Sequence, residues 1–151
     1  MYKEKLWPAP WLFISTALVI PASLLVFLPI SEFAGILVAI VLYLGCVGLL
    51  IAGSPVIEVT ATHFVAGKAK LPLELIGELT AAHGDQGRLE RGQRLDARAW
   101  LLIRGWIDPV VKVALTDPND PTPYWLVSTR HPERVIDAIS TAQTTRRTPG
   151  K

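Results

Sequence analysis

The amino-acid sequence predicts an α+β membrane protein in which an N-terminal two-helix transmembrane hairpin precedes a small β-sheet or barrel domain with one C-terminal helix. Three observations predict this fold class. The chain begins with two apolar runs, residues 11–28 and 33–52, and neither contains a charged side chain. Short runs rich in β-branched residues follow Ser54, and one amphipathic helical pattern follows Pro132.

Both apolar runs are long enough to cross a bilayer. At about 1.5 Å of rise per residue, each covers roughly 27 to 30 Å, which matches the hydrocarbon thickness of a membrane. The residues between them, Leu28 to Glu32, form a tight turn, so the two helices are antiparallel. We therefore expect a transmembrane hairpin over residues 1–53, a polar domain over residues 54–143 and a disordered tail over residues 144–151.

The charged start of the chain, followed by an apolar run, is also compatible with a signal peptide, and Pro21–Ser23 has a weak likeness to a cleavage site. A retained hairpin is favoured, because the first apolar run continues to Leu28 and a second full-length span follows at once. Within the first span, Pro21 removes one backbone hydrogen bond and is expected to bend the helix.

The second span carries small residues at helical spacing, with Gly35 four residues before Ala39 and Gly48 four residues before Ala52. Such pairs allow helices to approach closely in membranes. They could meet the first helix or a helix of a partner, and packing within the hairpin is the favoured interpretation. Neither span contains Asp, Glu, Lys, Arg or His, so an ion pathway made by this chain alone is not expected.

Basic residues on the flanks set the expected orientation of the hairpin. Lys3 and Lys5 precede it, Lys68 and Lys70 follow it, and the turn carries Glu32 without Lys or Arg. Positively charged flanks stay on the cytoplasmic side. We therefore expect a plasma (inner) membrane protein with two spans and both termini in the cytoplasm.

The polar part of the chain contains no motif that specifies a reaction. The net charge of +2 over 151 residues gives no basic footprint for nucleic acid. The lone Cys46 lies within the second span, and the three histidines are far apart without ligand spacing. We therefore predict a non-enzymatic protein with no catalytic residue, no metal site and no cofactor, and an enzyme acting at the membrane face is the weaker alternative.

The polar domain alternates short strands with turns. The charged stretch from Gly84 to Arg98 is interpreted as a solvated loop. Dense turn-forming residues at 117–123 exclude regular structure there. The predicted strands cover residues 56–60, 64–66, 71–81 with an interruption near Gly77, 100–103, 110–115 and 124–128.

The order of these elements is similar to that of the pleckstrin-homology-like domains of bacterial membrane proteins. In those proteins, a two-helix hairpin often precedes segments like Ile57–Thr60 and Leu71–Ile76 of this chain. Several short strands followed by a single C-terminal helix independently predict a small curved sheet or partly open barrel, with the helix over one opening.

The N-terminal Tyr2–Trp7, the central Arg98–Arg104 and the proline-rich Asp117–Pro132 are similar to an actinobacterial membrane family, the domain of unknown function 3093. The similarity covers nearly the whole chain, short of the tail. It implies an inner-membrane location and a cytoplasmic domain, and it supplies no activity.

Two functional hypotheses of different classes follow. In the first, the cytoplasmic domain is a membrane-tethered protein-interaction or scaffold module for another membrane or membrane-associated protein. Large aromatic residues beside arginines are enriched at interface hot spots. The candidate surface consists of Arg104, Trp106, Tyr124, Trp125 and Arg130. Aromatic residues fill cores equally well, so packing is the alternative for Trp106 and Trp125.

In the second hypothesis, the domain binds anionic lipid headgroups at the cytoplasmic face of the membrane. A basic residue near such a surface contributes about 1 kcal/mol of binding free energy. The candidate lipid contacts are Lys68, Lys70, Arg88, Arg91 and Arg94. Acids interspersed among these arginines leave a small positive surplus, which favours a solvated loop over a lipid site.

Overall fold

The structure, a computed structural model, describes residues 1–147 and divides the chain into two compact units. One unit is Trp7–Ser54, and the other combines Met1–Leu6 with the residues from Pro55 onward. The sequence-based boundary after residue 53 is therefore close to the structural one. The assignment of the first six residues to the hairpin is corrected, because they contribute a strand to the second unit.

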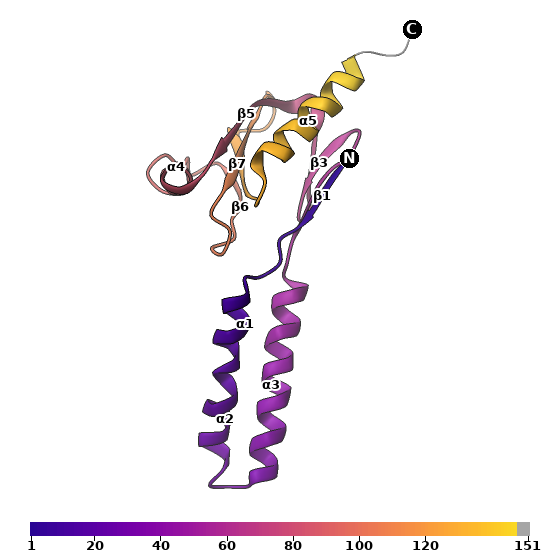
Figure 1. The fold of residues 1–151 in the computed structure, drawn as a ribbon. Helices are drawn as coiled ribbons and strands as arrows, with labels where there is room; N and C mark the ends of the chain where they lie inside the picture. Colours follow the sequence, from indigo (N-terminus) through magenta and orange to yellow (C-terminus); the bar gives the residue numbers. More distant parts are fainter. Residues whose placement is uncertain (148–151) are drawn as a thin grey trace. The chain divides into compact units, whose positions relative to one another are not determined.

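The first unit is a helical hairpin (Figure 1). Its helices are α1 (Pro10–Ala17), α2 (Val19–Phe27) and α3 (Glu32–Ala52). Both predicted spans are thus helical, and the first is interrupted at Leu18. Pro21 accounts for the interruption, because it has no N–H to donate to the carbonyl of Ala17, one turn earlier.

A capping residue stabilises the start of α3, and small residues on α3 allow it to pack against α2. Ser31 caps α3, since its hydroxyl accepts a backbone N–H of the first turn at 3.4 Å. Gly35 and Ala39 are buried, and a Cβ at Gly35 would lie 3.5 Å from the side chain of Leu24 on α2. This pair packs within the hairpin, as the sequence favoured. In contrast, a Cβ built at Gly48 meets nothing within 4 Å in residues 1–147 besides its chain neighbours and the adjacent backbone of α3 itself.

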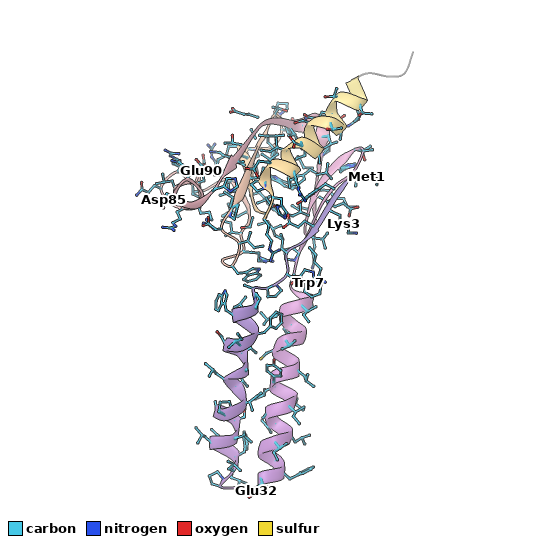
Figure 2. All side chains as sticks on the ribbon, in the orientation of Figure 1. Met1, Lys3, Trp7, Glu32, Asp85 and Glu90 are labelled. Carbon is cyan, nitrogen blue, oxygen red and sulfur yellow. The ribbon has the colours of Figure 1, made fainter. Side chains whose placement is uncertain are left out.

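Apolar side chains project outward along both helical segments (Figure 2). Only 6% of Pro10–Phe27 and 11% of the apolar window in Glu32–Ala52 is buried. Leu25 and Phe33 are each 77% exposed. Both segments are long and apolar enough to cross a membrane, and exposed apolar surface of this extent is unfavourable in water.

The second unit contains two four-stranded sheets. The first sheet consists of β1 (Tyr2–Lys5), β2 (Val56–Val59), β3 (His63–Ala66) and β4 (Ala69–Pro72). These strands pair antiparallel in chain order, and Lys5 lies opposite Val56. Burial alternates along β2 and β3, so that Ile57, Val59 and Phe64 face the core.

The second sheet consists of β5 (Ile76–Ala82), β6 (Trp100–Leu102), β7 (Val110–Leu115) and β8 (Tyr124–Ser128). Their spatial order is β5-β7-β8-β6. The β5–β7 and β7–β8 pairs are antiparallel, whereas β6 and β8 are parallel. The strands predicted near residues 100–103, 110–115 and 124–128 are confirmed.

The C-terminal helix and the two sheets share one main core. α5 (Pro132–Arg147) lies against β5 and β7 and beside β1 (Figure 1), and Val135 and Ile139 are fully buried. The Trp125 ring centre lies 4.2 Å from that of Trp100 and 6.3 Å from that of Phe64. The Phe64–Trp125 contact joins the two sheets, whereas Trp100 and Trp125 are neighbours within the second sheet. A smaller core cluster contains Ala82, Val110, Tyr124 and Leu126.

Two local predictions in this unit are wrong. The strand predicted over residues 71–81 is two strands of different sheets, separated by the 3₁₀ turn η1 (Leu73–Leu75). The stretch interpreted as a loop contains the helix α4 (Gly84–Arg91). The reason for α4 is distant in sequence, because the Asp108 carboxylate accepts the Gly84 N–H at 2.7 Å.

The predicted tail is also partly corrected. Residues 144–147 belong to the last turn of α5, and residues 148–151 lie outside the described residues. Contacts with η1 hold this end of the helix. The Gln143 amide donates hydrogen bonds to it, and Arg146 forms an ion pair with Glu74 at 3.3 Å.

Candidate functional site

Two of the five residues predicted for an interaction surface are core residues. Tyr124 and Trp125 on β8 are each 7% exposed, so neither belongs to an accessible surface. Successive residues of a strand point to opposite faces, and here both faces are covered: Trp125 lies in the main core and Tyr124 in the smaller cluster. The Tyr124 hydroxyl accepts the Asp96 N–H at 2.8 Å and donates to the Arg94 carbonyl at 3.3 Å.

Arg104 and Trp106 lie together in the loop between β6 and β7. The guanidinium carbon of Arg104 is 5.9 Å from the centre of the Trp106 ring, within the range of a cation–π contact. The Arg104 N–H donates to the Ser128 hydroxyl at 3.0 Å, which ties the loop to the end of β8. Trp106 is half-buried against the main core, and its indole N–H is buried without an acceptor among residues 1–147.

The three arginines predicted for lipid contact lie on or just after α4, and all are paired with acids. The pairs are Arg88 with Asp85 at 3.3 Å, Arg91 with Asp108 at 2.9 Å and Arg94 with Glu90 at 3.4 Å. The Gly84 N–H and the Arg91 guanidinium hold the pKa of the Asp108 carboxyl below its usual value. Lys112 adds a further ion pair to Glu90 at 2.9 Å. The positive charge of this region is therefore largely neutralised.

The two lysines predicted for lipid contact lie on the β3–β4 hairpin. Lys68 and Lys70 are exposed, and no carboxylate of residues 1–147 forms an ion pair with either. Gly67 makes the turn at φ +62°, a backbone conformation that other residues rarely adopt. Its N–H donates to the Val56 carbonyl at 2.8 Å, so the turn lies at the end of the sheet where β2 begins.

Sequence reasoning missed a cluster around Glu4 on β1. The Glu4 carboxylate accepts hydrogen bonds from the Tyr2 hydroxyl at 2.9 Å, from the Thr129 hydroxyl and from the Arg130 N–H at 3.1 Å. The Arg130 guanidinium lies 3.7 Å from the carboxylate, and the Glu4 side chain is 10% exposed. These bonds join β1 to the segment between β8 and α5. Arg130, a candidate for partner binding, thus also holds the fold.

The Glu4 cluster perturbs the neighbouring phenol. Burial, and then the hydrogen bond to the Glu4 carboxylate, raise the pKa of Tyr2 to about 12. No local sequence signal identifies this cluster, because Glu4 and Thr129 are separated by 125 positions. Tyr2 and Glu4 alternate with Lys3 and Lys5, which is the period-two pattern of a strand. Three of these four residues are charged, so the segment does not show the apolar alternation by which a strand is usually recognised.

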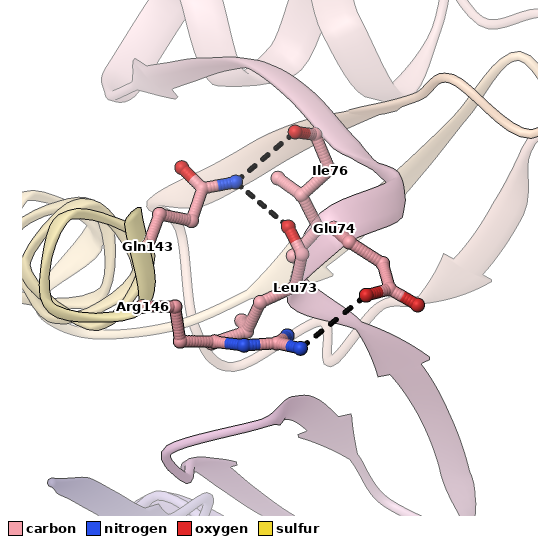
Figure 3. A pocket seen from close by; sticks show the side chains of 5 residues that line it. All are labelled: Leu73, Glu74, Ile76, Gln143 and Arg146. Atoms are coloured by element: carbon pink, nitrogen blue, oxygen red, sulfur yellow. Dashed lines mark hydrogen bonds and ion pairs between the residues drawn. The ribbon is translucent and has the colours of Figure 1, made fainter. Parts of the chain in front are cut away.

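A shallow cleft of about 280 Å³ lies between α5 and η1 (Figure 3). The Gln143 amide donates to the Leu73 carbonyl at 2.8 Å and to the Ile76 carbonyl at 3.1 Å. Arg146 pairs with Glu74 across the same cleft. These bonds engage the polar groups that line the cleft. The Leu73 carbonyl also accepts the Ile76 N–H within the 3₁₀ turn, so Gln143 is its second donor.

A second cleft, of about 380 Å³, lies between α5 and the β2–β3 turn. Small or apolar residues line much of it, among them Val59, Ala61, Ala138 and Ala142. Across residues 1–147, no group of three or more His, Cys, Asp or Glu side chains is arranged to hold a metal ion.

Comparison with known proteins gives one match. A protein-family model described as "Protein of unknown function (DUF3093)" matches residues 1–139. No match was found among curated proteins or among solved structures.

Proposed function

The chain belongs to the DUF3093 family, and we propose that it is a non-enzymatic inner-membrane protein. The unit that combines Met1–Leu6 with the residues from Pro55 onward, called the β unit below, is in this proposal a membrane-tethered protein-interaction module. In this proposal α1–α2 and α3 span the membrane, and both flanks of the hairpin lie in the cytoplasm. The basic residues on those flanks and Glu32 in the turn support this orientation.

The pairing of β1 with β2 is the observation that carries the proposal. Lys5 lies opposite Val56, and the Leu6 N–H donates to the Pro55 carbonyl at 2.9 Å. The two ends of the Trp7–Ser54 segment therefore start from neighbouring strands of one sheet. Both ends must lie on the same side of any membrane, which requires an even number of spans. Two apolar helices of suitable length meet that requirement.

The architecture of the β unit supports an interaction domain of the pleckstrin-homology-like kind. Two sheets and a C-terminal helix are the elements that such a domain requires. The parallel β6–β8 pair departs from an all-antiparallel arrangement. Arg104, Trp106 and Arg130 remain as the proposed contact residues for a protein partner, after removal of the two buried aromatics.

Membrane topology is testable because Cys46 is the sole cysteine. In a Cys46→Ala background, one cysteine is placed at Ile30 in the turn, which is 76% exposed, and another at Ser140 on the exposed side of α5. A membrane-impermeant maleimide should label the Ile30→Cys variant in intact cells. The Ser140→Cys variant should react only after the cells are opened. Recovery of the protein in the supernatant after high-speed centrifugation would exclude the proposal.

Partner binding requires a separate experiment on the full chain in native membranes. Cross-linking followed by purification in mild detergent should recover a defined protein that is lost with Arg104→Ala. Arg88→Ala is the matched control, since it removes the same charge from α4. Absence of any reproducible partner, or equal loss with both variants, would contradict the assignment of this surface.

A lipid-binding function based on α4 has less support. Its arginines are paired with acids, and surface ion pairs of this kind leave little net field. Lys68 and Lys70 are in a different environment, because they are exposed and form no ion pair with a carboxylate of residues 1–147.

A further inference from the structure

One end of the β unit carries both chain segments that lead into the hairpin, and we call it the junction end. It contains Leu6 and Pro55, the turn at Gly67 and Lys68, and Leu102 on β6. Besides the Leu6–Pro55 hydrogen bond, a Cβ at Gly67 would lie 3.6 Å from the Pro55 side chain and 3.7 Å from the Leu102 side chain. The lysine turn is therefore next to the residue at which the chain leaves the sheet.

The junction end combines exposed positive charge with exposed apolar surface. Lys68 is exposed at the turn, and Lys70 is exposed two residues later. Leu101, which precedes Leu102 on β6, is 42% exposed. Leu101 points to the opposite face of β6 from Leu102, so it lies at the same end of the unit as the lysines but on the other face of the strand. Lysines and an exposed aliphatic side chain at one end of a domain fit the interface of a bilayer, where headgroup phosphates attract the cations and the apolar group enters the boundary region.

The two linkers between the junction end and the hairpin are short. Three residues, Trp7–Ala9, separate Leu6 from α1, and two residues, Gly53 and Ser54, separate α3 from Pro55. Three residues span at most about 10 Å, which is about one Debye length at moderate salt. With the helices in a bilayer, Lys68 is held where an anionic surface attracts it.

We propose that the junction end of the β unit docks on the anionic surface of the bilayer through Lys68, Lys70 and Leu101. The proposal rests on the insertion of the hairpin described above. It fixes the orientation of the domain against the membrane, and it leaves the α4 arginines facing solvent.

The test uses the full chain in lipid nanodiscs, in the Cys46→Ala background. An environment-sensitive fluorophore is attached to the new cysteine of the Leu101→Cys variant. The control is the Asn119→Cys variant, labelled in the exposed turn between β7 and β8. This turn follows the end of β7 that is farther from Leu102 and the junction end. The discs contain phosphatidylcholine with or without phosphatidylglycerol, together with a headgroup-attached nitroxide quencher. Quenching is expected at position 101 and not at position 119, and it should increase with phosphatidylglycerol.

Matched charge variants identify the contacts. Lys68→Gln with Lys70→Gln should lower the ratio of docked to undocked protein about 25-fold, at about fivefold for each lysine near an anionic surface. Arg88→Gln with Arg94→Gln removes the same total charge and should leave the quenching unchanged.

The outcomes separate the docking proposal from the proposed insertion. Failure of the chain to elute with the nanodiscs would refute insertion itself. Elution with the discs, but equal quenching at positions 101 and 119 or no response to the two lysines, would refute docking alone. A third outcome is that position 101 is unquenched in nanodiscs but protected from maleimide labelling in native membranes. This outcome would assign the junction end to a protein neighbour and would also overturn the lipid proposal.

Discussion

The bond between Glu4 and Thr129 allows a quantitative test of how the N-terminal strand is held. Thr129 is fully buried, and its hydroxyl donates to a carboxylate that is 10% exposed. A hydrogen bond to a charged group contributes about 1.5 to 3 kcal/mol. The Arg130 guanidinium is 40% exposed and 3.7 Å away, so its ion pair adds less than about 1 kcal/mol.

Glu4→Gln removes the charge and replaces one acceptor oxygen with an amide donor. We expect it to lower the free energy of unfolding of the β unit by about 2 to 4 kcal/mol, since the new amide NH₂ must face either the two hydroxyls or the Arg130 N–H, which are all donors to Glu4. Thr129→Val keeps the shape of the side chain and removes the hydroxyl, with an expected loss of about 1 to 3 kcal/mol. The double variant should lose less than the sum, by a coupling energy of about 1.5 to 3 kcal/mol.

The measurement is urea unfolding of the full chain in mild detergent. Near-ultraviolet circular dichroism reports on the stacked Trp100 and Trp125 in the core. Glu58→Gln is the control, because Glu58 forms only an exposed ion pair with Lys3 at 3.6 Å, and a change within about 0.5 kcal/mol is expected. A coupling energy below about 0.5 kcal/mol between positions 4 and 129 would show that this bond does not hold β1.

Three further predictions concern the same unit. Gln143→Ala should lower the free energy of unfolding by about 1 to 3 kcal/mol in the urea assay, because the hydrogen bonds from its amide to the Leu73 and Ile76 carbonyls are lost; an unchanged midpoint would contradict this role. In an alkaline titration followed by tyrosine absorbance, Tyr2 should ionise near pH 12, and Tyr2→Phe should abolish that phase. Because the folded pKa is above the model-compound value of 10.0, the contribution of Tyr2 to stability is complete below pH 10 and is lost as the pH rises toward 12. Gly67→Ala should destabilise by about 1 to 2 kcal/mol because of its positive φ, whereas Gly105→Ala, with open space at its Cβ, should change stability little.

Local sequence patterns were sufficient to predict the elements that have a strong residue pattern of their own. The two apolar runs predict the helices, and the β-branched run of β7 predicts a strand with the observed bounds. The α4 helix was not predicted, and one contact that holds its start lies outside the local sequence, because the Gly84 N–H is bonded to Asp108, 24 positions later. The strand β1 was not predictable either, because the hairpin separates Lys5 from its partner Val56.

The candidate surface shows a second limit of sequence reasoning. Arg104 and Trp106 were two members of the candidate surface, and the structure brings their side chains together. For Tyr124 and Trp125 the sequence left core and surface open. Only the packing of a second sheet on one side of β8, and of the α4 region on the other, decides that both are buried.

The pairing of β1 with β2 has a consequence for how the protein is made. During synthesis, Tyr2–Lys5 leaves the ribosome first, yet its hydrogen-bonding partner appears only after the whole hairpin has been translated. The antiparallel hairpin returns the chain to the point from which it left the sheet, so the entropic penalty for closing so long a loop is greatly reduced once the hairpin has formed. We therefore expect the hairpin to form before the sheet is completed, and a bulky fusion partner placed on Met1 to interfere with the pairing of β1.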